Sequence, residues 1–342
     1  MNAILLFVLA VISFLITRAL ISGAIPLNIL DHPNERSLHT KVVPRTGGVA
    51  ILCSILVGLL AGWVINNSVP SVLHLLMALL LIAICSFADD IKGLSVVVRL
   101  CIHLSAVALL IHAGFVLSDV GVFGMEVLLP SLLAIMVTVL FVIWSINLYN
   151  FMDGMDGFAA GMTIIGFGVL AIIGFTKTES AFAFFNACLV AAVFGFWVFN
   201  FPPAKIFMGD LGSSILGFSF AVVSLWGVKD DIFSIWIPCI VFSPFIVDAT
   251  YTVIKRAASG ERFWEAHKTH FYQRLVEAGY GHRKVVMAEY LLMSVCGLFA
   301  LVLANFDTVK SVQLVGILLT GTLYTVIILI LNKKLRGKSH NH

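Results

Sequence analysis

Residues 128–146 read LLPSLLAIMVTVLFVIWSI and are apolar almost throughout, and the next fifteen residues read NLYNFMDGMDGFAAG. The first segment is long enough to cross a bilayer, because a spanning helix needs roughly 20 mostly apolar residues. The second segment carries a polar side chain at every third position: Asn147, Asn150, Asp153 and Asp156. The boundary between the segments therefore predicts a membrane helix that ends in a polar site.

The composition of the whole chain supports a membrane protein. Of the 342 residues, 60% are hydrophobic and only 11% are charged, whereas about a quarter of the residues in a soluble domain are charged. About eleven segments are long and apolar enough to span a bilayer, and none alternates with the period of two that a membrane barrel needs. We predict an all-α, polytopic integral membrane helical bundle that forms one domain over residues 1–342. The predicted spans cover residues 3–25, 47–66, 71–88, 95–116, 127–147, 158–175, 181–199, 212–228, 232–254, 286–305 and 311–332.

The basic residues lie mostly in loops that these spans place on one side. Those loops carry 16 of the 21 lysines and arginines, and basic loops stay on the cytoplasmic side of a membrane. We therefore predict an outside amino terminus, with the carboxyl terminus and the polar motifs in the cytosol. The formal net charge of +3 gives no signal for nucleic acid, because its distribution matters more, and no nucleic-acid partner is predicted.

A single helix cannot bring the four polar groups of NLYNFMDGMDGFAAG together. Each step of three residues turns an α-helix by roughly 300°, so the groups spread over about half a turn. Gly154 and Gly157 also interrupt the pattern. We predict that one helix ends near Asn150, that the chain turns over Gly154, and that a new helix begins near Asp156, so that both face one pocket. Plain helix capping by Asp153 and Asp156 is the alternative.

Two further motifs carry acids. FADDIKGLSVVVR holds Asp89, Asp90 and Arg99, and adjacent carboxylates persist where a cation or a basic group lies between them. A solvated acid pair at a helix end is the alternative for these two. NFPPAKIFMGDLGSS places Asp210 on a glycine-flanked turn, which suits Mg²⁺ because this ion takes one or two carboxylates together with waters and substrate phosphates.

Two basic motifs lie on the same predicted side. DHPNERSLHTKVVPRTGGVAI carries Lys41 and Arg45, and the loop around HKTHFYQRL carries His267, His270 and Arg274. Both suit anionic groups. Zinc ligation by the histidines is an alternative that we discount, because no cysteine or further histidine nearby completes a tetrahedral set. A surface for lipid headgroups is the other alternative.

Taken in chain order, PRTGG, FADDIKG, NLYNFMDGMDGFAAG, KIFMGDLGSS and HKTHFYQRL resemble the motifs of the polyprenyl-phosphate N-acetylhexosamine-1-phosphate transferases. The resemblance covers roughly residues 31–285. It implies that undecaprenyl phosphate attacks the β-phosphate of a UDP-N-acetylhexosamine, releasing UMP and leaving a lipid-linked diphosphate sugar. It also implies a bacterial cytoplasmic (inner) membrane, and Mg²⁺ as cofactor with Mn²⁺ as the alternative ion. Homodimer formation is left open.

The resemblance implies a role for each candidate residue. Asp89 with Asp90 would deprotonate or orient the lipid phosphate, and Asp210 would complete the catalytic set by binding the metal ion together with Asn150. The implied substrate-binding residues are Lys41, Arg45, Arg99, Asn147, Asp153, Asp156, Asn200, Phe207, His267, His270 and Arg274. Among these, Asn200 and Phe207 would lie at the uridine. A one-step reaction and a covalent aspartyl intermediate both stay open.

The last motif departs from the family pattern. Many members carry adjacent histidines where this chain has Tyr272 and Gln273. The departure puts His267 and His270 in doubt as direct equivalents of that pair. It favours the branch that starts O-antigen or another surface polysaccharide on GlcNAc, QuiNAc or FucNAc over the muramoyl-pentapeptide enzymes. The alternative function is a transporter or flippase of a polyprenyl-linked lipid, which the position of Asp248 inside a predicted span motivates.

Overall fold

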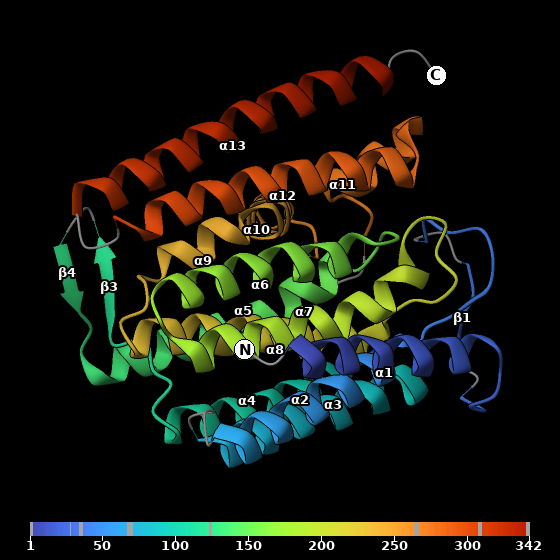
Figure 1. The fold of residues 1–342 in the computed structure, drawn as a ribbon. Helices are drawn as coiled ribbons and strands as arrows, with labels where there is room; N and C mark the ends of the chain where they lie inside the picture. Colours follow the sequence, from blue (N-terminus) through green and yellow to red (C-terminus); the bar gives the residue numbers. More distant parts are fainter. Residues whose placement is uncertain are drawn as a thin grey trace.

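Long α-helices whose axes are roughly aligned make up most of the molecule (Figure 1). The computed structural model describes residues 3–27, 29–33, 37–66, 71–122, 125–262, 267–306 and 310–339. Among these residues, nine helices are long and apolar enough to cross a membrane, which confirms the predicted all-α membrane bundle. They are α1 (Ala3–Ile21), α2 (Gly47–Asn66), α3 (Val72–Lys92), α5 (Ser131–Met152), α6 (Phe158–Thr176), α7 (Ser180–Asn200), α8 (Gly209–Lys229), α12 (His282–Ala304) and α13 (Lys310–Ser339).

Helix α8 forms the centre of the bundle. Its membrane-spanning segment is buried along its whole length, and it packs against α2, α3 and α5. Its sequence is apolar on all sides after the first turn, as expected for a helix surrounded by other helices. Gly217 lets α5 approach, because a Cβ at this position would lie 2.5 Å from the carbonyl oxygen of Ser145. In contrast, α1 and α13 are largely exposed.

Two of the predicted spans differ in the structure. The segment 95–116 contains α4 (Val96–His112), which is apolar but has only 17 residues. The prediction of one helix over 232–254 is wrong, because the chain breaks into α9 (Trp236–Val241) and α10 (Ser243–Ala258). Pro244 lies in the first turn of α10, where a residue without an N–H group can begin a helix but cannot continue the preceding one. Figure 1 shows α10 nearly end-on, so it crosses its neighbours.

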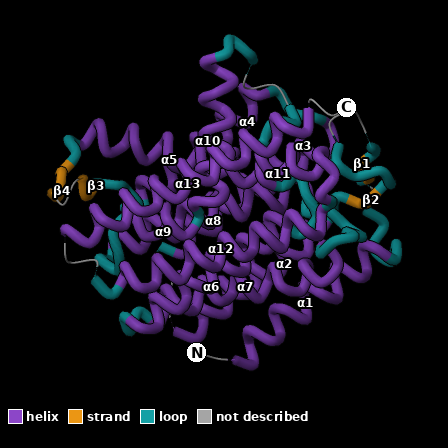
Figure 2. Tube along the Cα trace, turned by 90° about the horizontal axis from the view of Figure 1, so that it is seen from above, coloured by secondary structure: helices purple, strands orange, loops and turns teal. Residues whose placement is uncertain are grey.

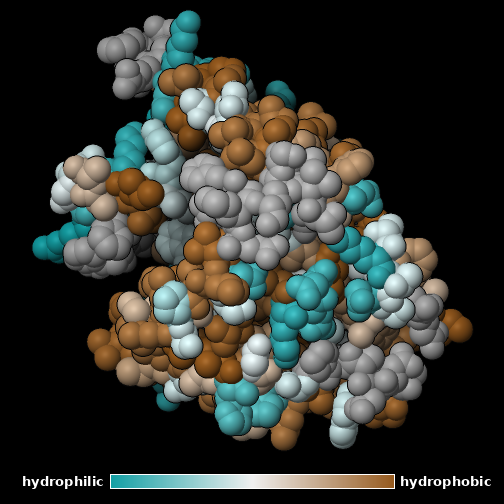
Figure 3. Space-filling model, turned by 90° about the vertical axis from the view of Figure 1, so that its left-hand side faces the viewer, coloured by the Kyte–Doolittle hydropathy of each residue, from teal (hydrophilic) through white to brown (hydrophobic). Residues whose placement is uncertain are grey.

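Two small antiparallel sheets lie at opposite ends of the bundle (Figure 2). Strand β1 (Leu30–Asp31) pairs with β2 (Val43–Pro44) at one end, and β3 (Asp119–Val122) pairs with β4 (Met125–Leu128) at the other. Figure 3 looks onto the β3–β4 end, where hydrophilic side chains form separate patches between hydrophobic ones. The functional site described below lies at the opposite end, beside β1 and β2.

The turn predicted within NLYNFMDGMDGFAAG is confirmed. Helix α5 continues to Met152 and α6 begins at Phe158, so the break falls two residues later than expected on each side. Gly157 has a φ of 73°, a conformation that glycine adopts without the steric cost of a Cβ atom. Close by, the short helix α11 (Phe271–Leu275) and one π-helical turn (Val276–Tyr280) lead into α12.

Candidate functional site

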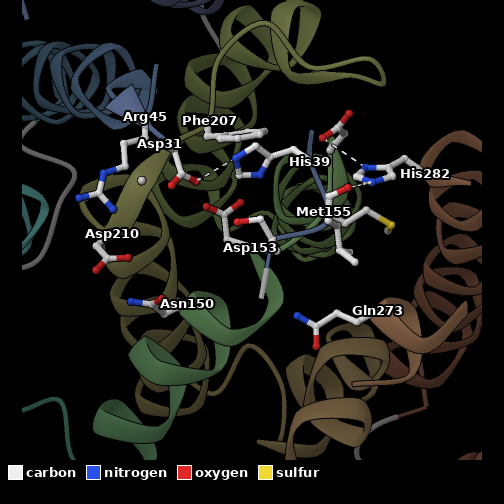
Figure 4. A pocket seen from close by; sticks show the side chains of 15 residues that line it. Asp31, His39, Arg45, Asn150, Asp153, Met155, Phe207, Asp210, Gln273 and His282 are labelled. Atoms are coloured by element: carbon white, nitrogen blue, oxygen red, sulfur yellow. Dashed lines mark hydrogen bonds and ion pairs between the residues drawn. The ribbon is translucent and has the colours of Figure 1, made fainter. Parts of the chain in front are cut away.

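The α5–α6 turn lines a cavity of about 350 Å³, which we call the central cavity (Figure 4). The start of α8, the start of α12, α11 and the chain around β1 and β2 form its other walls. The predicted site residues that line it are Arg45, Asn150, Asp153, Asp156, Phe207 and Asp210. Three sequence motifs that are far apart in the chain, PRTGG, NLYNFMDGMDGFAAG and KIFMGDLGSS, therefore contribute these residues to one region, and Asn147 of the opening motif faces elsewhere.

A second cavity of about 100 Å³, the inner cavity, lies between α3, α4, α5 and α8. Asp89, Arg99 and Asn147 line it, and Arg99 Nη1 lies 2.7 Å from Asp89 Oδ2. The inner and central cavities share Asn150 and Asp210. These two side chains therefore stand where a group inserted among the membrane helices could meet a group bound at the end of the bundle.

A third cavity of about 490 Å³, the outer cavity, shares Asp156 and Phe207 with the central one. Lys41 lines it, together with Arg283 from α12 and the loop 202–204. Asp156 holds this loop, since Oδ2 accepts the N–H of Ala204 at 3.0 Å. The three cavities are thus connected by shared side chains, from the membrane helices to a basic rim.

Backbone hydrogen bonds join the PRTGG segment to the segment around Phe207. Phe207 N–H donates to the carbonyl oxygen of Pro44 at 2.8 Å, and Gly47 N–H donates back to Phe207 at 2.9 Å. Gly48 allows the closest approach, because a Cβ there would lie 2.4 Å from the nitrogen of Gly212. The glycines of both motifs are therefore required for the two segments to meet beside Asp210.

The central cavity concentrates negative charge. Burial first, and then repulsion by Asp210, Asp90 and Asp31, raises the pKa of Asp153 well above its ordinary value. Among the described lining residues, Arg45 is the one arginine or lysine. Such a group of acids suits a bound cation, which would favour the ionised carboxylates.

The donor atoms around Asp210 fit Mg²⁺ only in combination with a substrate. Within the described part of the chain, no three His, Cys, Asp or Glu side chains gather closely enough to hold a metal ion. Asp210 and Asn150 lie on the same side of the cavity in Figure 4 and offer a carboxylate and an amide oxygen. Mg²⁺ commonly takes one or two protein oxygens and completes its octahedron with waters and substrate phosphates.

Five predicted site residues lie outside these cavities. Asn200 is buried, and both polar atoms of its amide are hydrogen-bonded: Oδ1 accepts the N–H of Gly157 at 3.0 Å and Nδ2 donates to the carbonyl oxygen of Ile206 at 2.9 Å. Asn200 therefore belongs to the scaffold that holds the α5–α6 turn, and its place at the uridine stays a prediction. Asp90 lines none of the three cavities formed by the described residues and instead contacts the start of α8.

The histidine motif is also placed differently from the prediction. His270 is 2% exposed, and its Nδ1 lies 3.4 Å from Asp248. His267 packs against His270, with 4.8 Å between the ring centroids. Arg274 lines a separate cavity near the end of α10. None of the three residues lines the central, inner or outer cavity, so this placement does not support their predicted contact with substrate.

The structure adds residues that were not among the predicted site residues. Gln273, at the position where the motif departs from the family pattern, lines the central cavity. His39 lies against the ring of Phe207 at 5.0 Å between centroids. His282 has Nδ1 3.3 Å from Asp156 and Nε2 3.2 Å from the carbonyl oxygen of Leu38. His39 could have been inferred from its nearness to PRTGG in the chain, whereas no sequence signal marks His282.

Comparison with known proteins supports the motif resemblance. Residues 72–228 match the family described as glycosyl transferase family 4. The chain is 30% identical over 317 residues to the "Probable undecaprenyl-phosphate N-acetylglucosaminyl 1-phosphate transferase" of Bacillus subtilis, covering 92% of this chain and 88% of that protein. It is 28% identical to the decaprenyl-phosphate N-acetylglucosaminephosphotransferase of Mycobacterium leprae, covering 86% and 82%.

The name of a third relative indicates a different sugar. The phospho-N-acetylmuramoyl-pentapeptide-transferase of Staphylococcus carnosus is 28% identical, covering 87% of this chain and 98% of that protein. The relatives thus match most of the chain while differing in the sugar or the polyprenyl carrier that they are named for. With the five motifs gathered at one end of a membrane helix bundle, these matches show that the chain belongs to the polyprenyl-phosphate hexosamine-1-phosphate transferase superfamily.

Proposed function

We propose that this protein transfers an N-acetylhexosamine 1-phosphate from a UDP-sugar to undecaprenyl phosphate and so starts a cell-surface polysaccharide, such as an O-antigen. The meeting of the central and inner cavities at Asp210 and Asn150 carries this proposal. The UDP-sugar occupies the central and outer cavities, at the polar end of the bundle. The acceptor phosphate enters the inner cavity between apolar helices, where its polyprenyl tail stays in lipid.

An oxygen of the acceptor phosphate attacks the β-phosphorus of the UDP-sugar. A new P–O bond forms, the bond from the β-phosphorus to the bridging oxygen breaks, and UMP leaves with that oxygen. Arg99 and Asp89 line the cavity assigned to the acceptor, so Arg99 pairs with its phosphate while Asp89 orients it or accepts its proton. Phe207 lines both donor cavities and offers a ring for the uracil to stack on.

Asp210 and Asn150 would hold Mg²⁺, or Mn²⁺ in its place, between the two substrates. When bound, the ion would neutralise the charge of the diphosphate and favour departure of UMP. Asp153 lies beside them and contributes to the negative potential that attracts the cation. Arg45 and Lys41 supply the positive charge on the donor side of the cavities.

The cellular setting follows from charge and from the last motif. Loops at the end of the bundle that carries the cavities hold most of the basic residues, so we place this end in the bacterial cytoplasm. Gln273 lines the central cavity where many family members have a histidine, which favours the branch that starts surface polysaccharides. We therefore propose UDP-GlcNAc as the first donor to test, followed by UDP-QuiNAc and UDP-FucNAc.

The test is UMP release by the purified protein with Mg²⁺, undecaprenyl phosphate and a panel of these three donors. We expect UMP from at least one donor, no UMP without the lipid phosphate, and loss of the reaction in EDTA. The matched control is Asp231→Asn, a change in an exposed residue at the β3–β4 end of the bundle, which leaves turnover unchanged. A folded protein that releases no UMP from any donor contradicts the proposal.

The flippase alternative loses the observation that motivated it. Asp248 does not stand alone in a span, since its carboxylate accepts the N–H groups of Phe271 and Tyr272 at 2.9 and 3.3 Å. The residue therefore has a structural partner at the start of α11, and a path for lipid headgroups is not needed to explain it.

A further inference from the structure

Helix α8 begins without a capping side chain of its own. Its first residue is Gly209, and the preceding N-cap position is held by Met208, which makes no side-chain capping bond. The first N–H groups of a helix have no partner within the helix and need an acceptor from elsewhere. The residue that needs to be held in place, Asp210, lies in this first turn.

Asp90, at the end of α3, supplies the missing acceptor. Its Oδ1 accepts the N–H of Asp210 at 3.3 Å and its Oδ2 accepts the N–H of Leu211 at 3.1 Å. Both carboxylate oxygens therefore point at the backbone of α8. Asp90 is 5% exposed, and its negative charge lies at the positive end of the α8 dipole, where it is stabilising.

Arg45 holds Asp90 from the other side. Its Nη2 donates to the main-chain carbonyl oxygen of Asp90 at 2.6 Å, and its Nε lies 3.6 Å from Oδ1. Gly209 completes the contact, because a Cβ at this position would lie 2.5 Å from the carbonyl oxygen of Arg45 and 3.0 Å from Asp90 Oδ2. Three motifs thus meet here without room for another side chain.

The neighbouring acids Asp89 and Asp210 differ from Asp90 because they face the cavities. Asp89 lines the inner cavity and Asp210 lines both the inner and the central cavities, so each can touch a substrate. A metal ligand or a proton acceptor needs a lone pair that faces the reacting groups. The two oxygens of Asp90 face the first turn of α8 instead.

We propose that Asp90 is a positioning residue: it caps α8 from the neighbouring helix and thereby fixes Asp210 at the junction of the two cavities, and Arg45 in turn fixes Asp90. In this arrangement PRTGG, FADDIKG and KIFMGD act as one support for a single carboxylate. The expected effect of Asp90 on turnover rests on the proposed function. Its expected effect on cation binding at Asp210 can be measured without turnover.

The first experiment compares Asp90→Asn with Asp90→Ala and Asp210→Asn in the full-length protein. An asparagine keeps an oxygen that can accept a helix N–H, so Asp90→Asn retains kcat within about tenfold and Mn²⁺ affinity within about threefold. Asp90→Ala loses about 10²-fold in kcat, since a shift of about 1 Å in a reacting group can have that effect. Asp210→Asn loses both turnover and Mn²⁺ binding.

Mn²⁺ binding is measured by electron paramagnetic resonance. Loss of a helix cap elsewhere in the protein would not change this binding, so the measurement reports on the position of Asp210. If no UDP-sugar is turned over, the proposed function fails, but the Mn²⁺ series still tests Asp90. A folded Asp90→Asn protein that is as inactive as Asp210→Asn, or that loses Mn²⁺ equally, overturns the positioning role. If Asp90→Ala does not fold, the asparagine variant alone decides.

The second experiment tests Arg45 by a double-mutant cycle with Asp90. If Arg45 acts through Asp90, the loss in kcat caused by Arg45→Ala becomes at least threefold smaller in the Asp90→Ala background, because coupled residues are not additive. Arg45→Lys keeps the charge but not the planar donor group, and recovers only part of the activity. Losses that multiply in the double variant show that Arg45 acts on substrate alone and remove it from the proposal.

Discussion

Two helices in this protein, α8 and α11, begin in the same way. In each, an aspartate from a neighbouring helix accepts two consecutive backbone N–H groups of the first turn. Asp90 of α3 does this for α8 at 3.3 and 3.1 Å, and Asp248 of α10 does it for α11 at 2.9 and 3.3 Å. Both aspartates are buried, and the helices that they cap carry residues of the motifs KIFMGDLGSS and HKTHFYQRL.

The two sites differ in what surrounds the aspartate. Around Asp90 stand Arg45 and further acids. Burial first, and then repulsion by Asp210, Asp90 and Asp31, raises the pKa of Asp153. Around Asp248 stand His270 and the hydroxyl of Thr252. The first site therefore carries more acids than bases, an imbalance that a bound cation can reduce, whereas Asp248 at the second site has a histidine beside it. The same capping device thus serves a reactive region and a purely structural one.

The sharpest test of this difference is to neutralise Asp210 at the first site and Asp248 at the second. We expect Asp210→Asn to lower the rate of UMP release by about 10³-fold or more, because it removes a charge that acts on the diphosphate in the transition state. Asp248→Asn keeps an oxygen for α11 and lowers the rate by less than about tenfold. The measurement is kcat at saturating Mg²⁺ and substrates, with thermal unfolding as the control for folding. Equal losses in the two variants would contradict the comparison.

Asp248 has its larger effect on stability. Asp248→Ala leaves two backbone N–H groups and His270 without their buried acceptor, so we expect the free energy of unfolding to fall by about 3 kcal/mol. Asp248→Asn is expected to cost about 1 kcal/mol. The measurement is unfolding in detergent at fixed pH and lipid content. Thr252→Val, which removes only a 3.2 Å hydrogen bond to Asp248, is the matched control, and an Asp248→Ala protein as stable as this control would refute the capping role.

The sequence predicted the bundle and the broken helix at NLYNFMDGMDGFAAG because both follow from local chemistry. An apolar run of about 20 residues has few alternatives to a membrane helix, and glycines between evenly spaced polar groups rule out one helical face. The break at Phe242 was missed, because residues 232–254 are apolar enough to conceal a change of direction. Pro244 was the available signal, since proline commonly begins a helix.

The different roles of Asp89 and Asp90 could not be predicted from the sequence. Asp89 and Asp90 are adjacent and chemically identical, and only the packing of α3 against α8 directs one to the inner cavity and the other to the backbone of α8. Asn200 is a similar case, because its motif position suggested the substrate while its amide is used by Gly157 and Ile206. Residue type and spacing therefore identified the region, and tertiary contacts decided each role.

Removing divalent cations should expose the charge imbalance at the central cavity. The pKa of Asp153 is raised in the folded protein, so between the ordinary carboxyl pKa near 4 and the raised value the folded state binds more protons than the unfolded state. Stability therefore falls as the pH rises through this window. We expect the unfolding temperature in EDTA to fall by a few degrees as the pH rises above the ordinary carboxyl pKa near 4, and Mg²⁺ to reduce this fall.

The control for this dependence is Asp153→Asn, which removes the titrating group while keeping its size. Its unfolding temperature should change less with pH than that of the wild type when both are measured in EDTA. A wild-type protein whose stability rises over the same range, with or without Mg²⁺, would show that repulsion among these acids is not what the cation relieves.

The smallest expected effect tests the α11 side of the comparison and has the opposite sign. Burial, with the nearby His270 and Arg256, lowers the pKa of His267 to about 4 from its ordinary 6.5. Between these values the unfolded state binds more protons, so stability increases as the pH rises from about 4 to 6.5 and is lost on acidification. His267→Gln should flatten this dependence when unfolding is followed with Mg²⁺ present. If the pH profile of this variant is unchanged, His267 is as solvated as a free side chain, and the region around His267 and α11 is open to water.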